Sequence, residues 1–187
     1  MRQRDDGKEK RIREAVIRLV LTEGFAGASI AKIAREAEVS PATVYIYYEN
    51  KEEMLKDIYL AYSDEMYQRL RAAVHVGTDA ADALEALMRG YYDYVKGHRE
   101  AFSFIEQFAG CPSMVTRCAA RKGIYQVYGL MEEMKAQRLL PPFSDANLAA
   151  MIFYPVKAIL LDHEEDPHEK EGRLTELIGM VQGLLHL

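Results

Sequence analysis

The sequence predicts an all-α protein of about nine helices, with a small N-terminal helix-turn-helix head and a larger C-terminal helical body. Three observations support this fold class. Apolar residues recur every three or four positions through most of the 187 residues, no stretch shows the alternation typical of a strand, and 49% of the residues are hydrophobic. We expect the head to span residues 1–51 and the body residues 52–187.

The first helix is predicted from Ile12 to Gly24, because Ala15, Val16 and Leu19 fall on one face and glycine commonly follows a helix end. Basic residues are frequent just before this helix and at its start: Arg2, Arg4, Lys8, Lys10, Arg11 and Arg13. They fit either a basic arm that lies near nucleic acid or a solvated, frayed terminus.

Two short helices follow, and a tight turn joins them. Ser29 is placed to cap the first, whose inward side consists of Ile30, Ile33, Ala34 and Ala37. Ser40 caps the second, and Pro41 takes its first position, where a missing N–H costs nothing. This arrangement is a helix-turn-helix, whose second helix fits the DNA major groove.

The second of these helices offers a small, hydroxylated and aromatic outer face. Val44 and Tyr48 are expected to close onto the first helix. Thr43 is then placed to meet a base edge or a thymine methyl group, and tyrosines beside it to bond phosphates, with Lys51 reaching the DNA backbone. The predicted DNA-contacting residues are Ser29, Ser40, Pro41, Ala42, Thr43, Tyr45, Ile46, Tyr47 and Lys51.

The run Thr-Val-Tyr-Ile-Tyr-Tyr-Glu-Asn-Lys at 43–51, after an Ile-Ala-x-x-Ala pair and Val-Ser, resembles the signature of the TetR family of bacterial transcriptional regulators. The resemblance covers about a quarter of the chain. It implies a three-helix DNA-binding head, a helical ligand-binding and dimerisation body, and a two-fold dimer on a palindromic operator. Glu38 and Ala42 depart from the pattern, since glycine is usual at both places. Because of this departure, Glu38 in the turn is expected to need an unusual backbone angle that costs about 1 kcal/mol.

Six further helices are predicted in the body. The fourth starts with a capping box of Asn50 and Glu53 and runs to about His75; in the family this helix links body to head. The others span about 79–97, 98–108, 113–139, 144–161 and 166–185. Pro155 is expected to kink the eighth helix, and Asp166 with Pro167 to start the ninth.

Aromatic and methionine residues gather in the fourth to seventh helices, where they form either ordinary core or the lining of a cavity for an apolar or aromatic effector. The predicted ligand-contacting residues are Tyr91, Phe102, Phe104, Phe108, Met114, Cys118, Tyr125, Tyr128 and Met131. The two cysteines, Cys111 and Cys118, lack the spacing of a zinc site and are buried thiols or a redox sensor.

The last two helices carry strong apolar stripes, which indicate either internal packing or a four-helix bundle formed across a two-fold axis. We expect a homodimer, as the resemblance also implies. The predicted interface residues are Ile152, Ile159, Leu174, Leu177, Ile178, Val181, Leu184 and Leu185.

The charge distribution and the motifs limit the functions that are possible. Residues 1–51 hold ten Lys or Arg against eight Asp or Glu, whereas the whole chain has a net charge of −5, which suits a head on DNA and a solvated body. No phosphate loop, nucleophile elbow or metal-ligand pair is present, so no catalytic residue, metal or cofactor is predicted. No membrane span or signal peptide is apparent, and a cytoplasmic location is expected.

The preferred function is therefore a ligand-responsive repressor that binds operator DNA as a dimer and that a small effector releases. Activation instead of repression stays open, and so does a regulator without a small-molecule effector. A helical scaffold whose head binds a protein, and a helical small-molecule-binding protein or enzyme, are the alternatives from other classes.

Overall fold

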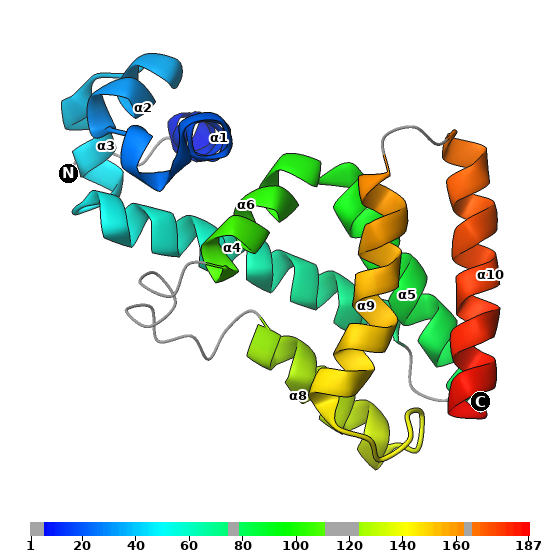
Figure 1. Cartoon of the computed structure of the whole chain (residues 1–187). Helices are drawn as coiled ribbons and strands as arrows, with labels where there is room; N and C mark the ends of the chain where they lie inside the picture. Colours follow the sequence, from blue (N-terminus) through cyan, green and yellow to red (C-terminus); the bar gives the residue numbers. More distant parts are fainter. Residues whose placement is uncertain (1–5, 75–78, 111–123, 163–165) are drawn as a thin grey trace. The chain divides into compact units, whose positions relative to one another are not determined.

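The structure is a computed structural model that describes residues 6–74, 79–110, 124–162 and 166–187; the side chains of residues 124, 125 and 167 are not described. Within these ranges the chain forms nine α-helices and no strand, which confirms the predicted all-α class (Figure 1). The helices are α1 (Asp6–Gly27), α2 (Ile30–Glu36), α3 (Pro41–Tyr47), α4 (Lys51–Ala73), α5 (Ala80–Gly97), α6 (Arg99–Ala109), α8 (Ile124–Ala136), α9 (Asp145–Leu161) and α10 (Pro167–Leu185).

The chain divides into two compact units. The first unit takes residues from 1–62 and 99–120, so it contains α1, α2, α3, the beginning of α4 and all of α6. The second takes residues from 63–98 and 121–187, and contains the rest of α4 with α5, α8, α9 and α10. The sixth helix thus packs with the head, although it is separated from it by the whole of α5 in the sequence.

Side-chain caps set the beginning of most described helices, as the sequence predicts for Ser29, Ser40, Asn50 and Asp166. Ser40 Oγ accepts a hydrogen bond from the Thr43 backbone N–H at 3.1 Å, and Pro41 fills the first helical position. Equivalent caps are made by Ser29, Asn50, Asp79 and Asp166. Each cap satisfies a backbone donor that the helix leaves without an internal partner, so these helix starts are encoded locally.

The first helix is longer than predicted at both ends. It is already helical at Asp6, the first described residue, well before the predicted start at Ile12, and within this stretch Arg13 pairs with Glu9 at 2.5 Å. Helical structure also resumes for a turn beyond Gly24, which has non-helical angles of φ 73° and ψ 174°. Gly24 therefore breaks the helix, as expected, but the helical assignment extends to Gly27.

The second unit is a helical body in which α5 packs against α9 and α10, and α8 packs against α9 (Figure 1). Gly90 of α5 lets the helices approach closely, since a Cβ there would lie 3.2 Å from Cβ of Ala73 in α4. Helix α9 continues through Pro155. Only Ile124–Ala136 of the predicted seventh helix is described, and its predicted start near Ser113 lies outside the described residues.

Gly24→Ala is expected to lower the free energy of unfolding by about 1–3 kcal/mol, because an alanine would be forced into backbone angles that only glycine adopts readily. Urea denaturation followed by circular dichroism measures the change. Gly129→Ala is the control: Gly129 is helical and faces open space, so alanine there should stabilise by about 0.5–1 kcal/mol. Equal effects of the two substitutions would contradict the strain assigned to Gly24.

Candidate nucleic-acid interface

The head is built around a buried apolar core that fixes α3 against α1 and α2. Ile12, Val16 and Val20 of α1, Ile33 of α2 and Val44 of α3 are wholly buried in it. Burial of such side chains is worth about 1.5–3 kcal/mol each, so the core holds α3 in place without any ligand. Val44 and Tyr48 both lie on the inward side, as the sequence predicts.

The turn between α2 and α3 is tight and bonded through the backbone. The Val39 N–H donates to Ala34 O at 2.9 Å, and the Ala37 N–H donates to Ile33 O at 2.9 Å. Glu38, between them, has a φ of 55°, which is the left-handed conformation expected for this position. A side chain in this region costs about 1 kcal/mol, and here the bonded turn imposes it.

The outer face of α3 is open. Tyr45 is 55% exposed and Ile46 is 46% exposed, while Pro41 and Ala42 are exposed and Thr43 is half-buried. The capping serines Ser29 and Ser40 are exposed as well. These seven predicted DNA-contacting residues thus lie on or beside the surface that a helix-turn-helix turns toward DNA.

Tyr47 differs from the prediction. It was expected on the outer face or its rim, but it is only 8% exposed and belongs to the core of the head. The physical reason is its spacing: Tyr47 follows Val44 by three residues, so both side chains fall on the inward side of a single turn. Its main role is therefore in packing.

Arg13 of α1 reaches the end of α3. Its Nε–H donates to the Tyr48 hydroxyl at 3.4 Å, and its guanidinium also pairs with Glu9. Burial raises the pKa of the Tyr48 hydroxyl, so the phenol stays protonated at neutral pH. Arg13 therefore stabilises the head by joining α1 to the residue that follows α3.

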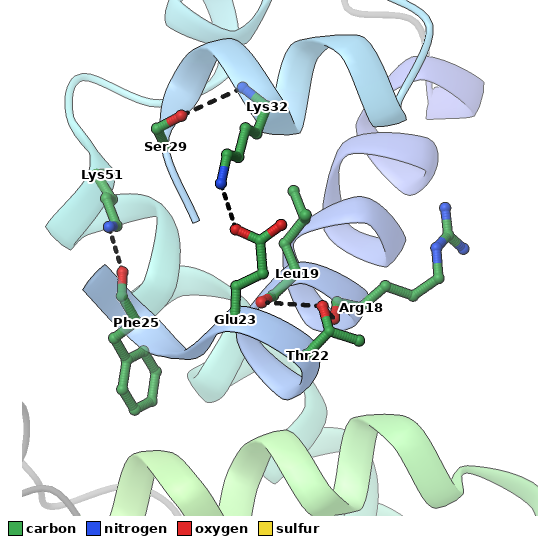
Figure 2. A network of polar contacts seen from close by, with 8 residues as sticks. All are labelled: Arg18, Leu19, Thr22, Glu23, Phe25, Ser29, Lys32 and Lys51. Carbon is green, nitrogen blue, oxygen red and sulfur yellow. Dashed lines mark hydrogen bonds and ion pairs between the residues drawn. The ribbon is translucent and has the colours of Figure 1, made fainter. Parts of the chain in front are cut away.

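Lys51 also makes an internal contact. Its ammonium donates to the backbone oxygen of Phe25, beside the break at Gly24 (Figure 2). In the same region Lys32 pairs with Glu23, and Ser29 accepts from the Lys32 backbone N–H (Figure 2). The cation predicted to reach the DNA backbone is thus held by a carbonyl in the last turn of α1, which orients the start of α4.

The ring of Phe25 is enclosed by aromatic side chains from α6. Its centroid lies 6.3 Å from that of Phe104 and 6.1 Å from that of Phe108, both edge-on. Phe108 also stacks on Tyr59 of α4 at 4.4 Å. Phe104 and Phe108, predicted to line a ligand cavity, instead lie in the core of the head because α6 packs there.

Three other predicted ligand-contacting residues, Tyr91, Tyr128 and Met131, belong to the second unit. Tyr91 packs edge-on against Phe153 at 4.8 Å in the second unit, where Met131 is buried and Tyr128 is half-buried. Phe102 is buried in the first unit. Met114, Cys118 and the side chain of Tyr125 lie outside what the structure describes.

The sequence pattern missed one polar residue in the body. Ser63 of α4 is 1% exposed, and its hydroxyl has no hydrogen-bond partner among the described residues. A buried hydroxyl without a partner costs about 1–3 kcal/mol, so it is a candidate contact for a bound molecule. The apolar residues near Ser63 in the sequence of α4 indicate only core packing. The buried hydroxyl is identified by its burial in the structure.

Most predicted interface residues are already used within the chain. Ile152, Ile159, Leu174, Ile178, Val181 and Leu185 are each at most 4% exposed in the single chain, because α9 and α10 pack on each other and on α5. Leu177 is half-buried and Leu184 is 64% exposed. The apolar side chains that α9 and α10 leave exposed are Tyr154, Leu161, Met180 and Leu184.

The described ranges contain no group of three or more His, Cys, Asp or Glu residues placed to hold a metal ion. Among the described helices, none combines the length and apolar character that crossing a bilayer requires.

The fold and the exposed face of α3 define a class: helical proteins whose N-terminal helix-turn-helix presents its second helix outward. Comparisons with known proteins agree with this class. A family model described as "Bacterial regulatory proteins, tetR family" matches residues 12–58, which include α2, α3 and the start of α4.

Relatives and solved structures extend the likeness. The chain is 26% identical over 116 residues to the uncharacterised HTH-type transcriptional regulator YuxN of Bacillus subtilis, covering 61% of this chain and 40% of that protein. It is 22% identical over 90 residues to the fatty acid metabolism regulator protein of B. subtilis, covering 48% and 46%. The chain thus spans less than half the length of these curated relatives.

A crystal structure of a TetR family transcription regulator from Marinobacter aquaeolei VT8 is similar over almost the whole chain. The TM-score is 0.74 with 26% sequence identity, and the match covers 96% of this chain and 97% of that one. Residues 12–58 thus match the tetR family of bacterial regulatory proteins, and the fold of the chain is similar to that of a TetR family transcription regulator.

Tyr47→Ala is expected to lower the free energy of unfolding by about 3 kcal/mol, because it leaves a cavity in the core of the head. Tyr47→Phe keeps the ring and should cost about 1 kcal/mol or less. Urea denaturation measures both. Tyr45→Ala, on the same helix but exposed, is the matched control and should change stability by about 0.5 kcal/mol at most. A Tyr47→Ala variant as stable as this control would contradict the packing role.

Proposed function

We propose that this protein is a DNA-binding transcriptional regulator that inserts α3 into the major groove of an operator. The observation that carries the proposal is the geometry of α3: Ser40 caps it, the head core fixes its inner side, and its outer residues are exposed. The match of residues 12–58 to the family model falls on this same part of the chain. Repression is the preferred mode of action.

Binding as a two-fold dimer would place two copies of α3 about 34–36 Å apart, one turn of DNA, on a palindromic operator. Within such a complex we assign phosphate contact to the Tyr45 hydroxyl and contact with base edges to the outer residues of α3. Lys51 is assigned mainly to orienting α4, because its ammonium already has a partner in Phe25 O.

We place the dimer face on the outer sides of α9 and α10. Tyr154, Met180 and Leu184 are 58–68% exposed there, which is unusual for large apolar side chains that meet only water. Three glycines of α10, Gly172, Gly179 and Gly183, have open space on the side where a Cβ would lie. A glycine inside a helix costs about 1 kcal/mol, and an open glycine surface lets a second backbone approach closely. The buried residues of α9 and α10 pack in the chain's own core and so fix the position of this face.

We further propose a division of function in which residues 1–51 bind DNA and residues 52–187 bind an effector and form the dimer. The effector would be a small apolar or aromatic molecule bound in the body, with Ser63 as a polar contact. Fatty acids are the first class to test, because a relative is named as a fatty acid metabolism regulator and the body core is apolar. An effector that binds one conformation better lowers DNA affinity through linkage, typically by 1–3 kcal/mol.

The proposed action is that of a binding protein in the cytoplasm, where the chromosome lies, and not that of an enzyme. The relatives and similar structures reported above are named as regulators. A scaffold whose head binds another protein, and a regulator without a small-molecule effector, are the competing functions. The DNA experiment below separates the first of these from the proposal.

The full-length protein is expected to protect a palindromic site within the promoter next to its own gene, with affinity that falls as salt concentration rises. Footprinting and fluorescence anisotropy measure site and affinity. Tyr45→Phe should weaken binding to specific and unrelated DNA by similar factors, since it removes a phosphate contact. Addition of fatty acids to the same assay tests release. Failure to bind either this promoter or any duplex selected from a random pool would overturn the DNA-binding proposal.

Leu184→Glu is expected to convert the dimer to monomer and to weaken operator binding at least about tenfold, because a charge would be buried in the proposed interface. Sedimentation velocity measures the oligomeric state, and circular dichroism checks that the fold is kept. Phe143→Glu is the matched control, as Phe143 is 54% exposed but lies in the loop between α8 and α9. A Leu184→Glu variant that stays dimeric at the same concentrations would show that the interface is elsewhere.

A further inference from the structure

The chemistry of α3 restricts what it can read in DNA. Its seven residues, Pro-Ala-Thr-Val-Tyr-Ile-Tyr, include no Arg, Lys, Asn, Gln, Asp or Glu. These six side chains make the usual specific hydrogen bonds to bases: Arg or Lys to guanine, Asn or Gln to adenine, and Asp or Glu to cytosine. Recognition by α3 must therefore rest on hydroxyl groups or on apolar contact.

The hydroxyl groups are mostly committed within the head. The Thr43 hydroxyl lies 2.9 Å from Ser40 Oγ, which already accepts from the Thr43 N–H. Tyr47 is buried. Tyr45 is exposed, and its long side chain is assigned to a phosphate above. The hydroxyl groups of α3 can therefore do little to distinguish one base pair from another.

Apolar contact is the remaining means of recognition. Ala42 and Ile46 lie four residues apart, so they share one face of α3, and both are exposed. Ile46 keeps 46% of its surface in contact with solvent in the single chain. In the major groove, the apolar group that base-pair edges present is the C5-methyl group of thymine.

Resting on the proposed DNA-binding function, we infer that Ala42 and Ile46 read thymine methyl groups, so that each operator half-site carries thymine where α3 faces it. Burying one methyl group against Ile46 removes apolar surface from water on both partners. A group of this size corresponds to about a three- to fivefold change in affinity. Ile46 is then a specificity-determining residue, while Thr43 mainly completes the helix cap.

The experiment uses the full-length protein and a duplex selected with it from a random-sequence pool. Each thymine of the half-sites is replaced in turn by uracil, which removes only the methyl group. Binding is expected to weaken three- to fivefold at one or two positions in each half-site, symmetrically about the centre. At such a position the uracil–adenine pair is then replaced by cytosine–guanine or by 5-methylcytosine–guanine. Tighter binding to the methylated pair than to the unmethylated pair is expected, because the two differ only by the methyl group.

Two variants assign the effect to a side chain. Ile46→Ala should bind the thymine and uracil duplexes equally at one of these positions, whereas Tyr45→Phe should weaken binding overall yet keep the full difference between them. Both residues are exposed, so unfolding midpoints should be unchanged.

The outcomes separate this inference from the function on which it rests. Absence of any selected duplex would overturn the proposed function itself. Selected duplexes that bind tightly but tolerate uracil at every position, or an Ile46→Ala variant with undiminished sensitivity to uracil, would overturn the reading of methyl groups and leave the DNA-binding function standing.

Discussion

The packing of the head depends on one junction, at the residue that follows the break in α1. Gly24 turns the chain with a positive φ, and Phe25 then contributes both its backbone and its ring. The Phe25 carbonyl accepts from the Lys51 ammonium at the start of α4, and the ring lies between Phe104 and Phe108 of α6. One residue thus ties the end of α1 to the two helices that complete the head. Because protein cores are close-packed, a displacement of α6 cannot leave this junction unchanged.

This arrangement gives the head more than the three helices of its motif. Phe108 stacks on Tyr59 of α4 as well as meeting Phe25, so the aromatic cluster joins α1, α4 and α6 in one compact unit. Aromatic pairs of this kind add about 0.5–1.5 kcal/mol each beyond the area they bury. The cluster therefore provides a physical route by which a displacement of α6 would reach α1 and α4 within the head.

Local features of the chain were predictable from the sequence, because they depend on neighbouring residues. The caps at Ser40 and Asp166 follow from residue types within three or four positions. Long-range packing was not predictable in this way. The stripe of α10 indicates an apolar face but cannot say whether that face meets the chain's own α5 and α9 or a second subunit. Likewise, the aromatic spacing of α6 does not reveal that Phe104 and Phe108 pack with the head.

Glu38 has a consequence for how the head responds to heat. Its side chain is exposed, so the strain of about 1 kcal/mol at this turn is not offset by burial. In a small domain that amount corresponds to roughly 4–8 °C in melting temperature. A single change to glycine would remove the strain without altering the outer face of α3. The thermal stability of the head can therefore change at this turn while the exposed residues of α3 stay the same.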